Sequence, residues 1–175
     1  KLCAGFGDAY WLARDDDGEF PKEFHRAMAD AGWLGITMPQ EYGGAGLGVT
    51  EAAIMMNEVA SHGGAMAAAS TVHINLFGPH PIVVFGSDDQ KQRWIPRLIE
   101  GKDQVAFGVT EPNAGLNTTA IKTFAEKVPG GYKVHGQKVW TSTAQVASKI
   151  MLLTRTTKLE DCKRPTDGIT IFYTD

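Results

Sequence analysis

The stretch Gly101-Lys-Asp-Gln-Val-Ala-Phe-Gly-Val-Thr110 marks a change in the hydrophobic pattern of this 175-residue chain. Before it, apolar residues recur every three to four positions, as they do on one face of a helix. After it, they alternate with polar residues, as they do in half-buried strands. Helices followed by strands predict an α+β protein rather than alternating βαβ units. We expect a helical domain over residues 1–103 and an antiparallel, barrel-like but incomplete β-domain over residues 104–175.

The helical half has four predicted helices, which are separated by glycine-rich turns. They cover residues 21–31, 50–62 and 65–77 and a segment that opens at Ser87. Ser87-Asp-Asp-Gln90 has the capping-box pattern that starts a helix, and Pro96 should kink or divide the helix that follows. The glycines of residues 43–48 lack the Lys-Ser/Thr ending of a phosphate-binding P-loop, so we interpret them as a flexible connection.

The second half reads as short strands joined by turns. Pro129-Gly130-Gly131 is a turn signal, and the charged stretch 157–167 is expected to be a solvent-exposed loop. The predicted strands cover residues 104–110, 121–127, 132–135, 138–141, 150–156 and 169–173.

Composition excludes several classes of function. The net charge of −3 gives no excess of Lys and Arg for binding nucleic acid, and no apolar run approaches the roughly 20 residues of a membrane span. Two distant cysteines favour a reducing compartment, and the five histidines lack the spacing of a metal site. A G-x-S-x-G nucleophile motif is also missing. Because the chain begins at Lys1 and ends on a predicted strand, we expect it to be truncated.

One constellation could carry chemistry. Residues 105–117 form a strand that ends in a Pro-Asn-Ala-Gly turn, which exposes backbone N–H groups able to bind an anion. Residues 136–142 place Trp140 beside the hydroxyls of Thr141 and Ser142. An aromatic wall beside hydroxyl donors suits a planar cofactor with polar edges. The alternative is an ordinary turn and a core tryptophan, and composition alone favours that alternative.

The motifs resemble those of the acyl-CoA dehydrogenase family. Thr110-Glu-Pro-Asn-Ala-Gly115 is similar to its T-E-P-x-A-G-S-D loop, and Gly136-Gln-Lys-Val-Trp-Thr-Ser142 to its G-x-K-x-W-I-[ST] segment. Helical landmarks at residues 32–36, 39–44 and 86–91 also resemble the family in the same order, so the likeness covers nearly the whole chain.

The resemblance implies a FAD-dependent oxidoreductase of fatty acid β-oxidation, which removes hydrogen from Cα and Cβ of an acyl-CoA thioester. The electrons would pass to an electron-transfer flavoprotein. It also implies a homotetramer or dimer, located in the cytoplasm of a bacterium or in the mitochondrion or peroxisome of a eukaryote. The family's catalytic glutamate lies in a C-terminal helical domain, which we expect to be missing here, so the fragment alone should be inactive.

Positions carried over from the family give the expected site residues. The flavin ring would contact the end of the first strand and the tryptophan segment, while the pyrophosphate and the CoA portion would lie by the loop between them. The expected cofactor residues are Phe107, Val109, Thr110, Gly115, Leu116, Trp140, Thr141 and Ser142, and the expected substrate residues are Leu116 and Asn117.

Two departures from the family pattern leave the function open to alternatives. Leu116 stands where the family usually has Ser, and Asn117 stands where it usually has Asp. These changes remove a hydroxyl and a charge from the CoA side of the loop. The alternatives are a flavin oxidase or monooxygenase of the same architecture, and a non-catalytic protein that binds CoA or a partner. No carboxylate of the chain has a pattern that identifies it as a catalytic base.

Overall fold

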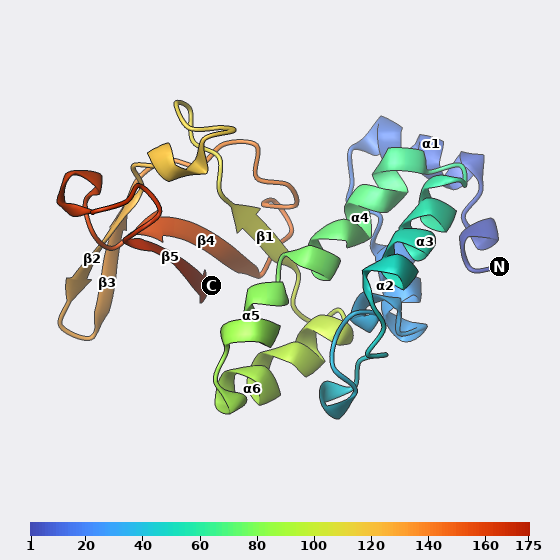
Figure 1. Ribbon diagram of the computed structural model, residues 1–175. Helices are drawn as coiled ribbons and strands as arrows, with labels where there is room; N and C mark the ends of the chain where they lie inside the picture. The colour runs from blue at the N-terminus through green and yellow to red at the C-terminus, as the bar shows by residue number, and fades with distance from the viewer. The chain divides into compact units, whose positions relative to one another are not determined.

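The computed structural model describes residues 1–175 and forms two compact units, Lys1–Val105 and Ala106–Asp175 (Figure 1). The first unit is helical and the second contains a five-stranded sheet. The predicted α+β class, with helices before strands, is therefore confirmed.

Six α-helices make up the first unit (Figure 1). The helices α2 to α4 and α6 follow the predicted ranges, and three short 3-10 turns lie at Cys3–Gly5, Trp33–Gly35 and Gln40–Tyr42. The helices are α1 (Asp8–Asp17), α2 (Lys22–Asp30), α3 (Val49–Ala60), α4 (Ala65–Phe77), α5 (His80–Phe85) and α6 (Asp88–Ile99).

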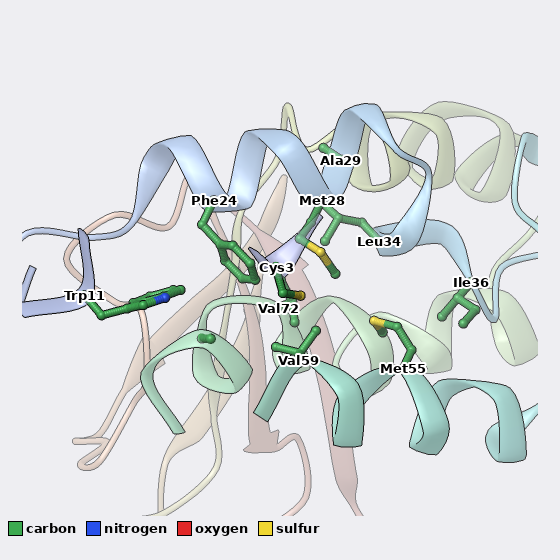
Figure 2. Close-up of a cluster of buried hydrophobic side chains, with 11 residues drawn as sticks. Cys3, Trp11, Phe24, Met28, Ala29, Leu34, Ile36, Met55, Val59 and Val72 are labelled. Atoms are coloured by element: carbon green, nitrogen blue, oxygen red, sulfur yellow. The ribbon is translucent and has the colours of Figure 1, made fainter. Parts of the chain in front are cut away.

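The core of the first unit lies between α2, α3 and α4. Phe24 and Met28 of α2 face Met55 and Val59 of α3, and Val72 of α4 lies between them (Figure 2). Each of these five side chains is buried. Burying a side chain of this size contributes roughly 1.5–3 kcal/mol, so the cluster is a main source of stability for the unit.

The capping box at the start of α6 is confirmed. The Ser87 hydroxyl accepts a hydrogen bond from the Gln90 amide at 3.3 Å, and the Gln90 side chain accepts one from the Ser87 amide at 2.9 Å. Pro96 lies inside α6 without dividing it, because the helix continues to Ile99. The helix ends in a bidentate ion pair between Arg97 and the buried carboxylate of Asp103.

The glycine loop is more ordered than the sequence suggests. Amides of residues 44–47 donate to backbone carbonyls of residues 35–39 at 2.8–3.0 Å. The loop therefore folds back on residues 35–39, and its glycines permit close backbone contact: a Cβ at Gly44 would lie 2.1 Å from the Met38 carbonyl oxygen.

The second unit contains a mixed sheet in the order β1-β4-β2-β3, with β5 also paired to β4 (Figure 1). The pairing of β2 with β3, closed by Val128 opposite Gly131, is antiparallel, and so is that of β4 with β5, which begins with Ile150 opposite Thr174. The pairing that joins β2 to β4 is parallel and consists of Phe124 opposite Arg155. The strands are β1 (Val105–Gly108), β2 (Phe124–Val128), β3 (Gly131–His135), β4 (Lys149–Arg155) and β5 (Ile169–Thr174).

The strand expected at residues 138–141 is wrong. The segment is attached by the Val139 amide, which donates to the Thr110 carbonyl, but Trp140 has φ +58° and cannot continue an extended strand.

No helix of the structure combines the length and the hydropathy that a bilayer span requires.

Candidate functional site

The two sequence motifs of the candidate site adjoin in the folded chain. The Val139 amide donates to the carbonyl of Thr110 at 2.9 Å, and the Lys138 ammonium donates to the carbonyl of Val109 at the same distance. The prediction that the turn after Thr110 meets the segment containing Trp140 is thus confirmed, although the residues are about 30 positions apart in sequence. Their roles toward a cofactor stay a prediction.

Trp140 has an unusual environment for a tryptophan. Its side chain is 89 % exposed, and its backbone lies in the left-handed region at φ +58°. A bulky residue at positive φ costs on the order of 1–3 kcal/mol, and such residues concentrate at functional sites. The alternative of a core tryptophan is therefore wrong, because this ring packs against little of the chain.

Hydroxyl groups without intramolecular partners lie on both sides of this contact. Thr110 precedes the turn, and Thr141 and Ser142 follow Trp140; none of their side-chain hydroxyls makes a hydrogen bond within the chain. Thr110 and Thr141 are half-buried, while Ser142 is exposed. Phe107 and Val109, the other residues expected to meet the ring, are also half-buried. The three hydroxyl groups can therefore donate hydrogen bonds to a polar ligand or accept hydrogen bonds from it.

The loop after the turn presents free backbone donors. Glu111 and Ala114 exchange two backbone hydrogen bonds at 3.0 and 3.1 Å, which closes the turn. The next amides, of Gly115, Leu116 and Asn117, donate no hydrogen bond within the chain and are exposed to solvent. Successive free amides of this kind suit an anionic ligand such as a phosphate.

The two positions that depart from the family pattern differ in their surroundings. The Leu116 side chain is fully exposed and contributes no polar group. The Asn117 side chain is already used, because it accepts from the amide and the hydroxyl of Thr119 at 3.2 and 2.6 Å. Asn117 is one of the two residues expected to contact substrate. In the structure its side chain caps the short 3-10 turn Thr118–Ala120.

A buried ion pair beneath the site was not foreseen from the sequence. Glu111 and Lys138 are each about nine-tenths buried, with Lys138 Nζ 2.9 Å from Glu111 Oε1. The amides of Lys122 and Thr123 also donate to this carboxylate, at 2.7 and 2.9 Å. Burial raises the pKa of Glu111, but hydrogen bonds from Thr123, Lys122 and Lys138 outweigh it and lower the pKa to about 2. Only the pairing of distant segments reveals this arrangement.

The same geometry excludes Glu111 as a general base. Its oxygens are engaged by three donors, and a pKa of about 2 makes the carboxylate a weak proton acceptor near neutral pH. Glu111 is therefore a structural anion of the turn.

A second buried cation holds the segment that follows the loop. Arg155 is 2 % exposed and donates only to backbone carbonyls: to Ile121 at 3.1 Å, to Asp167 at 3.0 Å, to Pro165 at 2.7 Å and to Thr119. The guanidinium thus fixes residues 119–121 to the loop before β5. Because the acceptors are backbone carbonyls from two segments that lie more than 40 positions apart along the chain, residues 119–121 and 165–167, no motif in the sequence indicates this role.

Comparison with known proteins identifies the same two parts of the chain. The family model described as "Acyl-CoA dehydrogenase, N-terminal domain" matches residues 8–102, and the model described as "Acyl-CoA dehydrogenase, middle domain" matches residues 106–175.

Individual relatives extend the likeness over most of the chain. The acyl-CoA dehydrogenase FadE12 of Mycobacterium tuberculosis is 32 % identical over 181 residues, which cover 98 % of this chain and 45 % of that protein. The mitochondrial isovaleryl-CoA dehydrogenase of Arabidopsis thaliana is 36 % identical over 160 residues, 90 % of this chain and 38 % of the relative. The butyryl-CoA dehydrogenase structure from Megasphaera elsdenii superposes with a TM-score of 0.81 at 27 % identity, over 99 % of this chain and 45 % of that chain.

The chain spans less than half the length of each of these relatives. Within that span, the helical unit and the β unit follow in the same order as the N-terminal and middle domains of the two family models. The chain therefore belongs to the acyl-CoA dehydrogenase family.

Proposed function

We propose that this chain forms one wall of a FAD site in an enzyme that dehydrogenates an acyl-CoA thioester at Cα–Cβ and passes electrons to an electron-transfer flavoprotein. The observation that carries the proposal is Trp140, which is exposed and held at positive φ beside free hydroxyls. An apolar ring that the chain itself leaves uncovered gains most by contact with a planar ligand.

The residues fit the chemical features of a flavin. The Trp140 ring offers a flat apolar surface, and the hydroxyls of Thr110 and Ser142 can hydrogen-bond to the polar edge of the ring system and to N5. The free amides of Gly115 and Leu116 suit the pyrophosphate. Bound FAD would supply the two-electron acceptor; the residues of this chain would bind it, orient it and limit the access of water.

The contribution of this chain is therefore binding and orientation rather than proton removal. Glu111 is excluded as a base by its occupied oxygens and its low pKa. None of the residues described above is proposed as the base that removes the α-proton of the thioester.

The remaining family properties are part of the proposal. We infer a homotetramer or dimer, located in the cytoplasm of a bacterium or in a eukaryotic mitochondrion or peroxisome. The relative from Arabidopsis thaliana is a mitochondrial protein, and that name supports the second location for a eukaryotic source.

Flavin binding is tested by titrating FAD with the protein, expressed together with any coding sequence contiguous with it, and following flavin fluorescence. We expect the unaltered protein to quench the flavin and Trp140→Ala to weaken affinity at least about tenfold, equivalent to about 1.4 kcal/mol. Trp33→Ala is the matched control, because Trp33 is a partly exposed tryptophan of the helical unit. Equal affinity in the Trp140→Ala and unaltered proteins would refute the assignment.

The reaction is tested by mixing the flavin-loaded protein anaerobically with acyl-CoA thioesters of graded chain length and following loss of the oxidised-flavin absorption. Reduction by thioester, followed by slow reaction with oxygen and fast reaction with an electron-transfer flavoprotein, is the expected result. Rapid reaction with oxygen would instead identify an oxidase or monooxygenase. Flavin that no thioester reduces would identify a binding protein.

Leu116→Ser examines the departure at the CoA side of the loop. The substitution restores the hydroxyl that the family usually has, at a side chain that is fully exposed and therefore free of packing effects. If a serine hydroxyl serves CoA esters at this position, the variant should bind them more tightly, with FAD affinity unchanged. Unchanged affinity for the CoA ester would show that Leu116 is not a handicap.

A further inference from the structure

The buried pair Glu111–Lys138 lies at the junction of the two segments that carry the candidate cofactor residues. The Lys138 ammonium donates to the Val109 carbonyl and to Glu111 Oε1, both at 2.9 Å. One residue further on, the Val139 amide donates to the Thr110 carbonyl at 2.9 Å. Three hydrogen bonds therefore join residues 109–111 to residues 138–139.

Trp140 follows this junction directly. Its backbone at φ +58° is unfavourable for a bulky residue, and its exposed ring has no packing that would hold it. On its other side, Thr143 also has positive φ, and its carbonyl accepts from the amides of Val146 and Ala147 at 3.0 and 2.9 Å. The strained tryptophan is thus fixed between two hydrogen-bonded anchors.

A buried ion pair is a weak source of net stability, since desolvation of both charges offsets most of their attraction. It can still fix a geometry, because each charge tolerates few alternative positions. Here the anchor on the anion side is firm, as the Lys122 and Thr123 amides also hold Glu111. Lys138 is the flexible partner, and its position depends on Val109 and Glu111 together.

We propose that the Glu111–Lys138 pair is a positioning element, which holds Thr110 and Trp140 at the separation that the flavin requires. The proposal rests on the proposed function for the identity of the ligand. Neither charged group need touch the flavin. Lys138 acts through the backbone of residues 109 and 139, and Glu111 acts by holding Lys138.

The test compares Lys138→Met, which removes the ammonium but keeps an unbranched side chain, with Lys138→Arg, which keeps a cation and its donors. Lys149→Met is the control, because Lys149 lies in β4 of the same unit and pairs with Asp175 rather than with Glu111. Two quantities are measured for each variant: amide hydrogen exchange by NMR, and FAD affinity by fluorescence.

In Lys138→Met we expect the Val139 amide to exchange about tenfold faster and the FAD affinity to fall about tenfold. Changes of this size correspond to the loss of a charge-assisted hydrogen bond. Exchange at Leu152, inside β4, should stay within about threefold of the unaltered protein, because the sheet itself is intact. Lys138→Arg should recover most of the FAD affinity, and Lys149→Met should lose none.

Three results would overturn the positioning role: unchanged Val139 exchange in Lys138→Met, FAD affinity equal to that of Lys149→Met, or acceleration spread equally to Leu152. Should Lys138→Met fail to fold, Glu111→Gln decides the question, since it keeps the shape and one acceptor while removing the anion. Faster exchange confined to the region of the Val139 amide in that variant supports the role. Unchanged exchange of the Val139 amide contradicts it. An unaltered protein that binds no FAD would refute the proposed function, while Val139 exchange would still report whether the pair holds the segment.

Discussion

Three glycines at the two ends of the β2–β3 hairpin allow the cost of backbone conformation to be separated from the cost of crowding. Gly131 has an ordinary φ and open space around its Cα; Gly130 has open space but φ +86°; Gly136 has φ +155° and no space. A Cβ at Gly136 would lie 2.3 Å from Thr123 Oγ1 and 2.7 Å from Thr123 Cα. Alanine at Gly131 therefore imposes no penalty, and alanine at Gly130 imposes backbone strain alone. Alanine at Gly136 imposes backbone strain together with steric overlap.

The magnitudes follow from these environments. Gly131→Ala should change the free energy of unfolding by less than about 1 kcal/mol, with a gain possible because the unfolded chain loses freedom. Gly130→Ala, in the two-residue turn between β2 and β3, should cost about 1–2 kcal/mol for positive φ. Gly136→Ala should add about 1–3 kcal/mol of overpacking to a similar strain, about 2–5 kcal/mol in all.

The neighbour of Gly136 cannot move aside without breaking other contacts. The Thr123 amide donates to Glu111 at 2.9 Å, and the Thr123 carbonyl accepts from the Arg155 amide at 2.8 Å. Crowding at Gly136 should therefore be transmitted to the Glu111 turn, and FAD affinity should fall with stability.

Native-state hydrogen exchange of the β4 amides measures this effect, because it reports the opening of the second unit independently of the helical one. The expected order of destabilisation is Gly136→Ala, then Gly130→Ala, then Gly131→Ala. If Gly136→Ala costs no more than Gly130→Ala, the contact with Thr123 is not the constraint, and the reasoning from the close approach fails.

Three further outcomes can be measured. Ser87→Ala should lower the stability of the helical unit by about 0.5–2 kcal/mol in thermal unfolding, since it removes the cap of α6, whereas exposed Ser70→Ala should have little effect. Burial lowers the pKa of His25 below its usual 6.5, so the stability of this unit should decline as pH falls below about 6.5; His25→Gln should flatten that slope, and exposed His135→Gln should retain it. Ser142→Ala should keep FAD affinity but slow flavin reduction by acyl-CoA about tenfold in anaerobic rapid mixing, equivalent to about 1.4 kcal/mol; an unchanged rate would remove Ser142 from the reaction.

The helices that the sequence predicts are those with a clear apolar stripe or a cap. Helix α2 buries Phe24, Met28 and Ala29 along one face, and α6 carries the Ser87 box, so both were foreseen. Helix α1 was missed because only Trp11 of its ten residues is buried and most of the others are polar. Helix α5 was missed because Gly78 and Pro79 end the α4 pattern and leave only six residues before Gly86.

The candidate site was predictable in its motifs but not in its support. Thr110 and Trp140 lie in recognisable segments, and turn signals at Pro129 and Gly130 indicated that the chain folds back between them. Glu111 and Lys138 are 27 residues apart, and nothing in either segment marks them as buried partners until the segments pair. Pairing of this kind depends on tertiary contacts, which local propensity does not record.

The energetics of Trp140 connect the support to the function. An exposed tryptophan forgoes the roughly 1.5–3 kcal/mol that burial of a large apolar side chain provides, and its positive φ costs on the order of 1–3 kcal/mol more. No contact of the Trp140 ring within the second unit offsets this free energy. Residues on both sides of Trp140 are nevertheless held by hydrogen bonds. Such an arrangement is stable only because the rest of the sheet compensates, and it becomes favourable when another surface covers the ring. The anchored, uncovered tryptophan is thus best explained as a contact prepared in advance, whose ordering cost is met in folding rather than when a ligand binds.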